Sequence, residues 1–176
     1  MKSLVRIVLI VLLAKSSFLL FASDSTDQYA KQAGKHDIAY KNLVNAKELM
    51  LLNCTLITQN SNKNTETILA NHSQLTNCLS RSIQLFEEVV SSLKNLEYSN
   101  AAQQTNLRKV IGRYEQAIED ITLIKDNTER KGDYSLTSGQ YYTICMEQLD
   151  SVLDIVNGAK AKLYFIRKQV QRIVKN

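Results

Sequence analysis

A run of apolar residues spaced three and four apart, from position 142 to position 173, constrains the fold of this chain most strongly. Its members are Tyr142, Cys145, Leu149, Val152, Val156, Ala159, Leu163, Ile166, Val170 and Ile173. Residues three and four apart share one face of an α-helix, so this spacing predicts a long helix with one apolar stripe. Unbroken three-four spacing is also typical of a coiled-coil seam. In either case the stripe needs other helices to cover it.

Three earlier segments carry the same spacing and would provide that cover. Helices are expected at about residues 37–59, 67–97 and 100–124, with 125–138 as the longest connection. The chain has no proline, so nothing forces these helices to stop. Gly112 lies within the third stripe and is expected to mark the close approach of a neighbouring helix. Four amphipathic helices joined by short loops predict an all-α, up-down-up-down four-helix bundle.

The first 22 residues have the pattern of a secretory signal peptide. Lys2 and Arg6 precede an apolar run at residues 7–14, and small residues follow near Ala22. We expect cleavage after Ala22 and a secreted, extracellular protein that keeps no stable membrane span. The alternative is a signal anchor, but Lys15 interrupts the apolar run, and a lysine at the centre of a span costs about 2.5–3.5 kcal/mol.

The rest of the chain is expected to form one domain. Residues 23–36 are polar and contain Gly34, which indicates a flexible lead-in, and the helical bundle domain would occupy residues 37–176. The net charge of +5 includes three basic residues of the segment expected to be removed. Their removal leaves 19 basic and 17 acidic side chains, a net of +2. A charge this small does not indicate a nucleic-acid partner.

Cys54, Cys78 and Cys145 all belong to the secreted chain, and an odd number in an oxidising compartment leaves one cysteine unpaired. In an alternating bundle, Cys54 and Cys145 lie about 5 Å apart along the bundle axis, whereas Cys78 lies roughly 20 Å from the end they share. We therefore predict a disulfide between Cys54 and Cys145, which closes a loop of roughly 90 residues and contributes about 4 kcal/mol.

Pairing of Cys78 with Cys145 is the alternative disulfide. In the favoured pairing Cys78 is the remaining thiol, and its place beside Leu75 and Leu79 indicates a buried small hydrophobic side chain. The other reading of Cys78 is an intermolecular bond that would make the protein a covalent homodimer.

Two triplets, beginning at Asn53 and Asn71, are acceptor sequons for N-glycosylation and predict that both asparagines are exposed. The two histidines, His36 and His72, lie in different segments with no carboxylate or cysteine at ligand spacing. His72 is interpreted as a solvent-facing polar residue. Neither a catalytic motif nor a cofactor or metal motif is found in the sequence, so we predict that the protein is not an enzyme.

The second half of the last expected helix is basic, with six cations and no acid after Asp154, namely Lys160, Lys162, Arg167, Lys168, Arg172 and Lys175. Their spread of positions favours a solvated surface that complements the helix dipole. Contact with an acidic receptor face, a heparin-like glycan or an anionic membrane is the alternative.

A signal peptide followed by a cysteine-bearing bundle is similar in format to the plant invertase and pectin methylesterase inhibitors. Those proteins carry four paired cysteines, two of them in an N-terminal hairpin. This chain has three, the first at Cys54, so we assign it to no family.

The sequence favours a secreted helical interaction protein that binds another extracellular protein as an effector, inhibitor or modulator. One alternative is an extracellular carrier that holds a lipid or a small hydrophobic ligand in the bundle core. A second alternative is a structural protein that self-associates through the heptads of residues 142–173.

Overall fold

The computed structural model describes residues 2–59, 65–96, 101–130 and 136–175, with side chains described at 29–59, 65–96, 101–129 and 139–169. These residues form four α-helices: α1 (Lys2–Thr58), α2 (Thr65–Lys94), α3 (Ala101–Arg130) and α4 (Leu136–Lys175). The described ranges contain no strand, and none of their helices is long and apolar enough to span a membrane.

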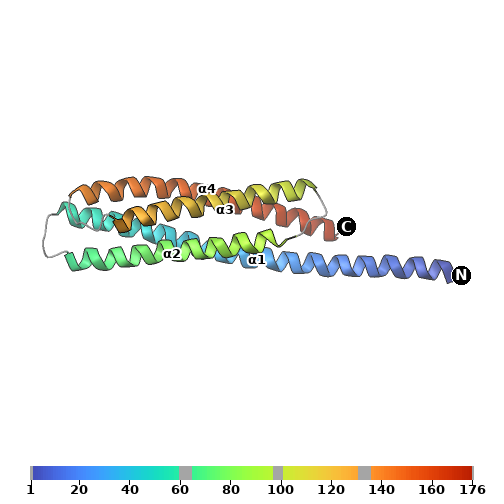
Figure 1. The fold of residues 1–176 in the computed structure, drawn as a ribbon. Helices are drawn as coiled ribbons and strands as arrows, with labels where there is room; N and C mark the ends of the chain where they lie inside the picture. Colours follow the sequence, from blue (N-terminus) through green and yellow to red (C-terminus); the bar gives the residue numbers. More distant parts are fainter. Residues whose placement is uncertain (1, 60–64, 97–100, 131–135, 176) are drawn as a thin grey trace.

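The four helices pack as a closed ring. α1 contacts α2 and α4, and α3 also contacts α2 and α4. Figure 1 shows that successive helices run in alternating directions. The prediction of an all-α, four-helix bundle is therefore confirmed.

α1 differs from the prediction at residues 23–36, where we expected a flexible lead-in. The helix continues through Gly34, and Tyr29, Gln32 and His36 are buried. These three residues continue the three-four spacing toward the core, but their polar atoms concealed the stripe. A glycine within a helix costs only about 1 kcal/mol, which burial of this face outweighs. Figure 1 shows the N-terminal part of α1 extending past the other helices, and cleavage after Ala22 stays a prediction.

α3 extends further than predicted and shortens the connection expected at residues 125–138. Ile124 and Thr128 are both buried, so the stripe continues beyond its expected end. The Thr128 hydroxyl donates to the Lys125 carbonyl at 2.7 Å, and Lys125 pairs with Glu129 at 2.8 Å. These local contacts suit a helix, so the charged composition did not indicate a loop. The sequence also predicts a turn at residues 60–65. Residues 60–64 lie outside the described ranges, and Thr65 is the first residue of α2.

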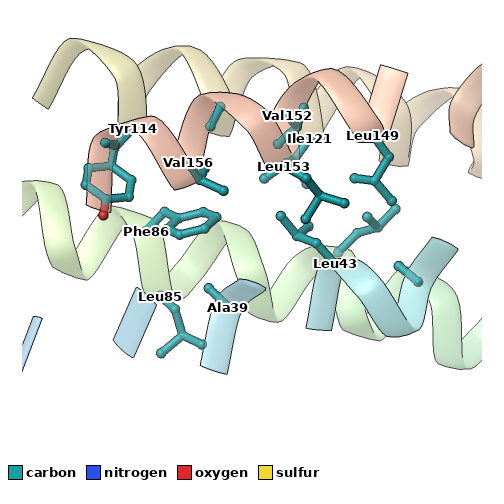
Figure 2. Packing of buried hydrophobic residues seen from close by; sticks show 14 of the residues in the cluster. Ala39, Leu43, Leu85, Phe86, Tyr114, Ile121, Leu149, Val152, Leu153 and Val156 are labelled. Carbon is teal, nitrogen blue, oxygen red and sulfur yellow. The ribbon is translucent and has the colours of Figure 1, made fainter. Parts of the chain in front are cut away.

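The stripes of all four helices meet in one hydrophobic core. The eight α4 stripe residues from Tyr142 to Ile166 are each 6% exposed or less, whereas the side chains of Val170 and Ile173 lie outside those described. Figure 2 shows part of this core, with Phe86 of α2 beside Tyr114 of α3. Burial of each Leu, Ile or Val side chain stabilises the fold by about 1.5–3 kcal/mol. The α4 stripe is thus covered by its own chain.

The glycine that marks a close helix approach is Gly158, and the prediction for Gly112 is wrong. A Cβ placed on Gly112 would meet none of the described atoms within 4 Å. A Cβ placed on Gly158 would collide with the guanidinium group of Arg113. Gly158 therefore lets a side chain of α3 lie directly against the backbone of α4.

Candidate functional site

All three cysteines are free thiols, so the predicted disulfide between Cys54 and Cys145 is not formed in the structure. Cys54 Sγ instead donates to the Gly139 carbonyl at 3.2 Å. Burial, with the Cys54 thiol acting in the same direction, raises the pKa of Cys145 to about 11. The disulfide prediction compared only the positions of the cysteines along the bundle axis and neglected the direction of each side chain around its helix. Gly139 and Cys145 lie about 120° apart around α4, so a thiol directed at Gly139 does not meet a thiol in the core.

Cys78 is half-buried and packs against the core cluster. Burial raises the pKa of its thiol, which lowers the fraction of reactive thiolate. Cys78 therefore packs against the core as a small side chain does, but it is half-buried and not buried as we expected. An intermolecular bond through Cys78 stays a prediction.

The two asparagines predicted to carry glycans contact each other between helices. Asn71 is half-buried, but Asn53 is 0% exposed, so the prediction that Asn53 lies on the surface is wrong. Asn71 Nδ2 donates to Asn53 Oδ1 at 2.9 Å. Asn53 Nδ2 donates to the Ile68 carbonyl at 3.4 Å and to the Tyr142 hydroxyl at 3.5 Å. A glycan on Asn53 Nδ2 would have to replace these contacts inside the bundle.

His72 completes this group, which we call the asparagine cluster: Asn53, Asn71, His72 and Tyr142. Its Nδ1 lies 3.0 Å from the Tyr142 hydroxyl, and burial lowers its pKa. His72 is therefore not the solvent-facing residue that we expected. The cluster joins α1, α2 and α4 by directed hydrogen bonds, and a buried asparagine of this kind fixes the register of packed helices.

A second buried cluster surrounds His36 and joins α1, α2 and α3. His36 Nδ1 lies 3.0 Å from the Tyr114 hydroxyl, and the His36 ring stacks on Tyr40 with centroids 6.2 Å apart. Burial, with Lys160 acting in the same direction, lowers the pKa of His36 to about 4. The ring is therefore neutral at physiological pH. Its aromatic surroundings, which include Phe86 at 5.9 Å between centroids, indicate a structural role.

An aromatic and basic surface lies along the C-terminal half of α4. Tyr164 and Phe165 are adjacent in sequence and are 55% and 58% exposed. Lys168 Nζ lies 4.8 Å from the centroid of the Tyr164 ring. With Lys160 and Arg167, which border the same seam with α1, these residues form what we call the aromatic-basic patch.

A cavity of about 50 Å³ lies between α1 and α4 at this patch, lined by Tyr29, Ala33, Lys160, Leu163, Tyr164 and Arg167. Tyr29 Oη and Arg167 Nε are buried and have no hydrogen-bond partner among the described residues. Lys160 forms an ion pair with Asp37 of α1. The sequence prediction placed Tyr29 in a loose segment and Arg167 on a solvated face. The spacing of Tyr29, Gln32 and His36 was the signal that could have located this side of the cavity.

An open groove of about 350 Å³ lies between α2 and α3. Its apolar lining comes from Leu93, Leu96, Leu107 and Ile111, and its polar lining from Lys94, Gln104, Arg108 and Glu115. Lys94 and Glu115 form an ion pair of 2.7 Å across the two helices. Within the described ranges, no three His, Cys, Asp or Glu residues come close enough together to hold a metal ion.

Two predicted charges of α4 also have specific partners. Asp150 pairs with Lys47 at 2.5 Å, and Lys160 pairs with Asp37. Lys160 is thus not only a solvated charge that complements the helix dipole, because both ion pairs join α4 to α1. Comparison of the chain with protein-family models, with curated proteins and with solved structures finds no match.

Proposed function

We propose that this chain is a secreted helical interaction protein that binds an acidic surface of another extracellular protein through the aromatic-basic patch. The observation that carries the proposal is the pair of adjacent, exposed aromatic side chains at Tyr164 and Phe165. A signal peptide that ends at Ala22 would direct the chain into the secretory pathway, and its cleavage would release the bundle into the extracellular space.

The centres of protein interfaces are enriched in aromatic residues and arginine, and the aromatic-basic patch exposes both kinds of residue. Tyr164 and Phe165 are a little over half exposed, so burial of the exposed part by a partner would contribute about 1–2 kcal/mol for each. Lys168 already lies over the Tyr164 ring, which holds one face of that ring in place. The patch therefore offers a partner a partly ordered surface.

The charge of the patch indicates the chemistry of the partner. Asp37 neutralises Lys160, whereas Arg167 and Lys168 have no carboxylate partner among the described residues. A surface with two unpaired cations favours an acidic partner, because complementary charge raises the rate of association and suppresses wrong partners.

A capture experiment with a matched control tests this proposal. Phe165→Ser removes an exposed aromatic side chain from the patch, and Ile144→Ser removes a residue of similar exposure, 51%, near the other end of α4. Protein captured from the relevant extracellular fluid should be lost with Phe165→Ser and retained with Ile144→Ser. Failure of the unaltered chain to capture any protein at micromolar concentration, or equal capture by both variants, would contradict the proposal.

The groove between α2 and α3 gives the carrier alternative a specific location. Its four apolar side chains would contact a hydrocarbon chain, and Arg108 would lie beside an acidic head group. In this form of the carrier alternative the ligand would bind on the outside of the bundle, whereas the sequence analysis expected it in the core. A fluorescent fatty acid that gains no intensity with the protein, or one whose binding is unchanged in Leu107→Ser, would rule the groove out.

A further inference from the structure

We propose that the cavity between α1 and α4 is a carboxylate-binding site, in which Tyr29 and Arg167 bind the two oxygens of a carboxylate carried on a short apolar stem. The assignment of that carboxylate to an Asp or Glu side chain of the partner rests on the proposed function. The affinity of the cavity for a carboxylate does not.

Two hydrogen-bond donors of residues that line the cavity lack an acceptor. The Tyr29 hydroxyl and the Arg167 Nε–H are both buried, and neither has a partner among the described residues. An unsatisfied buried polar group is costly, and native structures rarely keep one without a role. Since an arginine nitrogen can only donate, the group that satisfies it must be an acceptor.

The charge around the cavity selects an anionic acceptor. Arg167 carries a fixed positive charge, and its planar group binds the two oxygens of a carboxylate better than a lone neutral oxygen. Lys160 adds a second cation to the lining, partly neutralised by Asp37. A phosphate would bring three or four oxygens to a site with two buried free donors, so a carboxylate fits the donor set better.

The volume and the lining of the cavity indicate the size and polarity of the group that carries the carboxylate. One water needs about 10–15 Å³ by the same measure, so 50 Å³ has room for roughly three to five groups of that size. A carboxylate with one or two methylenes has this number of heavy atoms. Ala33, Leu163 and the ring of Tyr164 line the remaining wall, and they suit an apolar stem. Aspartate and glutamate side chains have this form.

Sodium butyrate reproduces the glutamate side chain, with its methyl group in the place of Cα outside the cavity. Titration of the purified protein with butyrate, monitored by the arginine Nε–H signals in NMR spectra, tests the site directly. The Arg167 signal should shift saturably, with a dissociation constant of about a millimolar, as a single buried ion contact allows. Butyramide, which has the same shape and no charge, should leave the signal in place. A cavity that holds only water would give no saturable shift with butyrate, and the proposal would be overturned.

Variants separate the site from a general effect of salt. Tyr29→Phe keeps the ring and removes the hydroxyl, and Arg167→Lys keeps the charge and removes the planar donor group. Each should weaken butyrate binding by about tenfold or more, since a hydrogen bond to a charged group is lost. Because Arg167→Lys also removes the signal, its binding is followed through the Ala33 amide. Arg81 of α2 is exposed and lies outside both proposed sites, so Arg81→Lys is the control and should bind as the unaltered chain does. Equal binding by all three variants would contradict the proposal.

A final comparison identifies the source of the carboxylate and keeps the two proposals distinguishable. If the partner supplies it, Arg167→Lys should reduce partner capture and excess butyrate should compete with the partner. If butyrate binds but neither effect is seen, the site takes a free short-chain acid and the assignment to the partner is wrong. Loss of capture in Phe165→Ser without any butyrate binding would uphold the proposed function and overturn the carboxylate site.

Discussion

Protonation of His36 should destabilise the bundle at mildly acidic pH. The buried ring is neutral in the folded state, because burial lowers its pKa from the ordinary value of 6.5 to about 4. In the unfolded chain the ring takes up its proton near the ordinary pKa. The unfolded state therefore binds more protons between about pH 6.5 and pH 4. The stability that neutral His36 contributes is fully present above pH 6.5 and is lost as the pH falls toward 4.

The size of this loss follows from the shift. A difference of 2.5 pH units between the two states corresponds to about 3 kcal/mol, at about 1.4 kcal/mol per unit. His36 is 1% exposed, so solvent screening hardly reduces this value. For a bundle of ordinary stability, roughly 5–15 kcal/mol, the loss is a large fraction of the total. Below pH 4 the folded state is protonated too, and the loss from this residue stops growing.

Urea unfolding at pH 7, 6, 5 and 4 measures the effect by difference. His36→Gln lowers stability at pH 7 but removes the titrating group, so its stability should fall by about 3 kcal/mol less than that of the unaltered chain between pH 7 and 4. Lys35 lowers the pKa of Glu88. Carboxylates of this kind titrate in both proteins, so their contributions cancel in the difference between the two stability curves. The chain has one other histidine, and burial lowers its pKa too. Because His72 is only half-buried, His72→Gln should reduce the loss of stability by less than His36→Gln does. Parallel stability curves for His36→Gln and the unaltered chain would refute the reasoning.

Four further outcomes are expected. Asn53→Ala should lower the free energy of unfolding by about 2–4 kcal/mol, because three hydrogen bonds and a buried volume are lost. Asn71 is half-buried, so Asn71→Ala should lower it by only about 1–2 kcal/mol. A double-mutant cycle that shows no coupling between the two asparagines would contradict their contact. Mass spectrometry of protein from secretory cells should find no glycan on Asn53 in the folded fraction, and a glycosylated, natively stable species would show the asparagine cluster to be wrong. Gly112→Ala should raise the free energy of unfolding by about 1 kcal/mol through helix propensity. Gly158→Ala should raise it by less, because the Arg113 side chain must move. Equal increases for the two variants in thermal unfolding would contradict the contact between Arg113 of α3 and the backbone of α4. Maleimide should label Cys54 and Cys78 before Cys145, whose thiol is buried and has its pKa raised to about 11, and fastest labelling at Cys145 would contradict its burial.

The apolar spacing was sufficient to predict the four helices, because each stripe is a local pattern that repeats within a few turns. Leu149, Val152 and Leu163 were all predicted as stripe residues and are all buried. The pattern failed where polar atoms occur on a buried face. Tyr29, Gln32 and His36 occupy stripe positions in α1, but hydropathy classed the segment as a loose lead-in.

The polar clusters could not be predicted from the sequence, since each depends on residues far apart in the chain. Asn53 meets a hydroxyl 89 positions away at Tyr142, and His36 meets one 78 positions away at Tyr114. Spacing along one helix says nothing of such partners. The disulfide prediction failed for a related reason, because depth along the bundle was estimated but the direction of each side chain around its helix was not.

The two polar clusters fix the position of α1 in the bundle, and this position determines the geometry of the cavity at the aromatic-basic patch. Apolar stripes alone tolerate a shift of one helix along another, whereas directed hydrogen bonds do not, and so they select one register. Asn53 and His36 fix α1 at two points about 25 Å apart along the helix, and Tyr29 follows about two turns beyond His36. The ion pairs of Asp37 and Lys47 with α4 join the intervening seam. Tyr29 and Arg167 are therefore brought to the same cavity by helices whose relative position is already set, and a ligand would not have to order them, which removes part of the cost of binding.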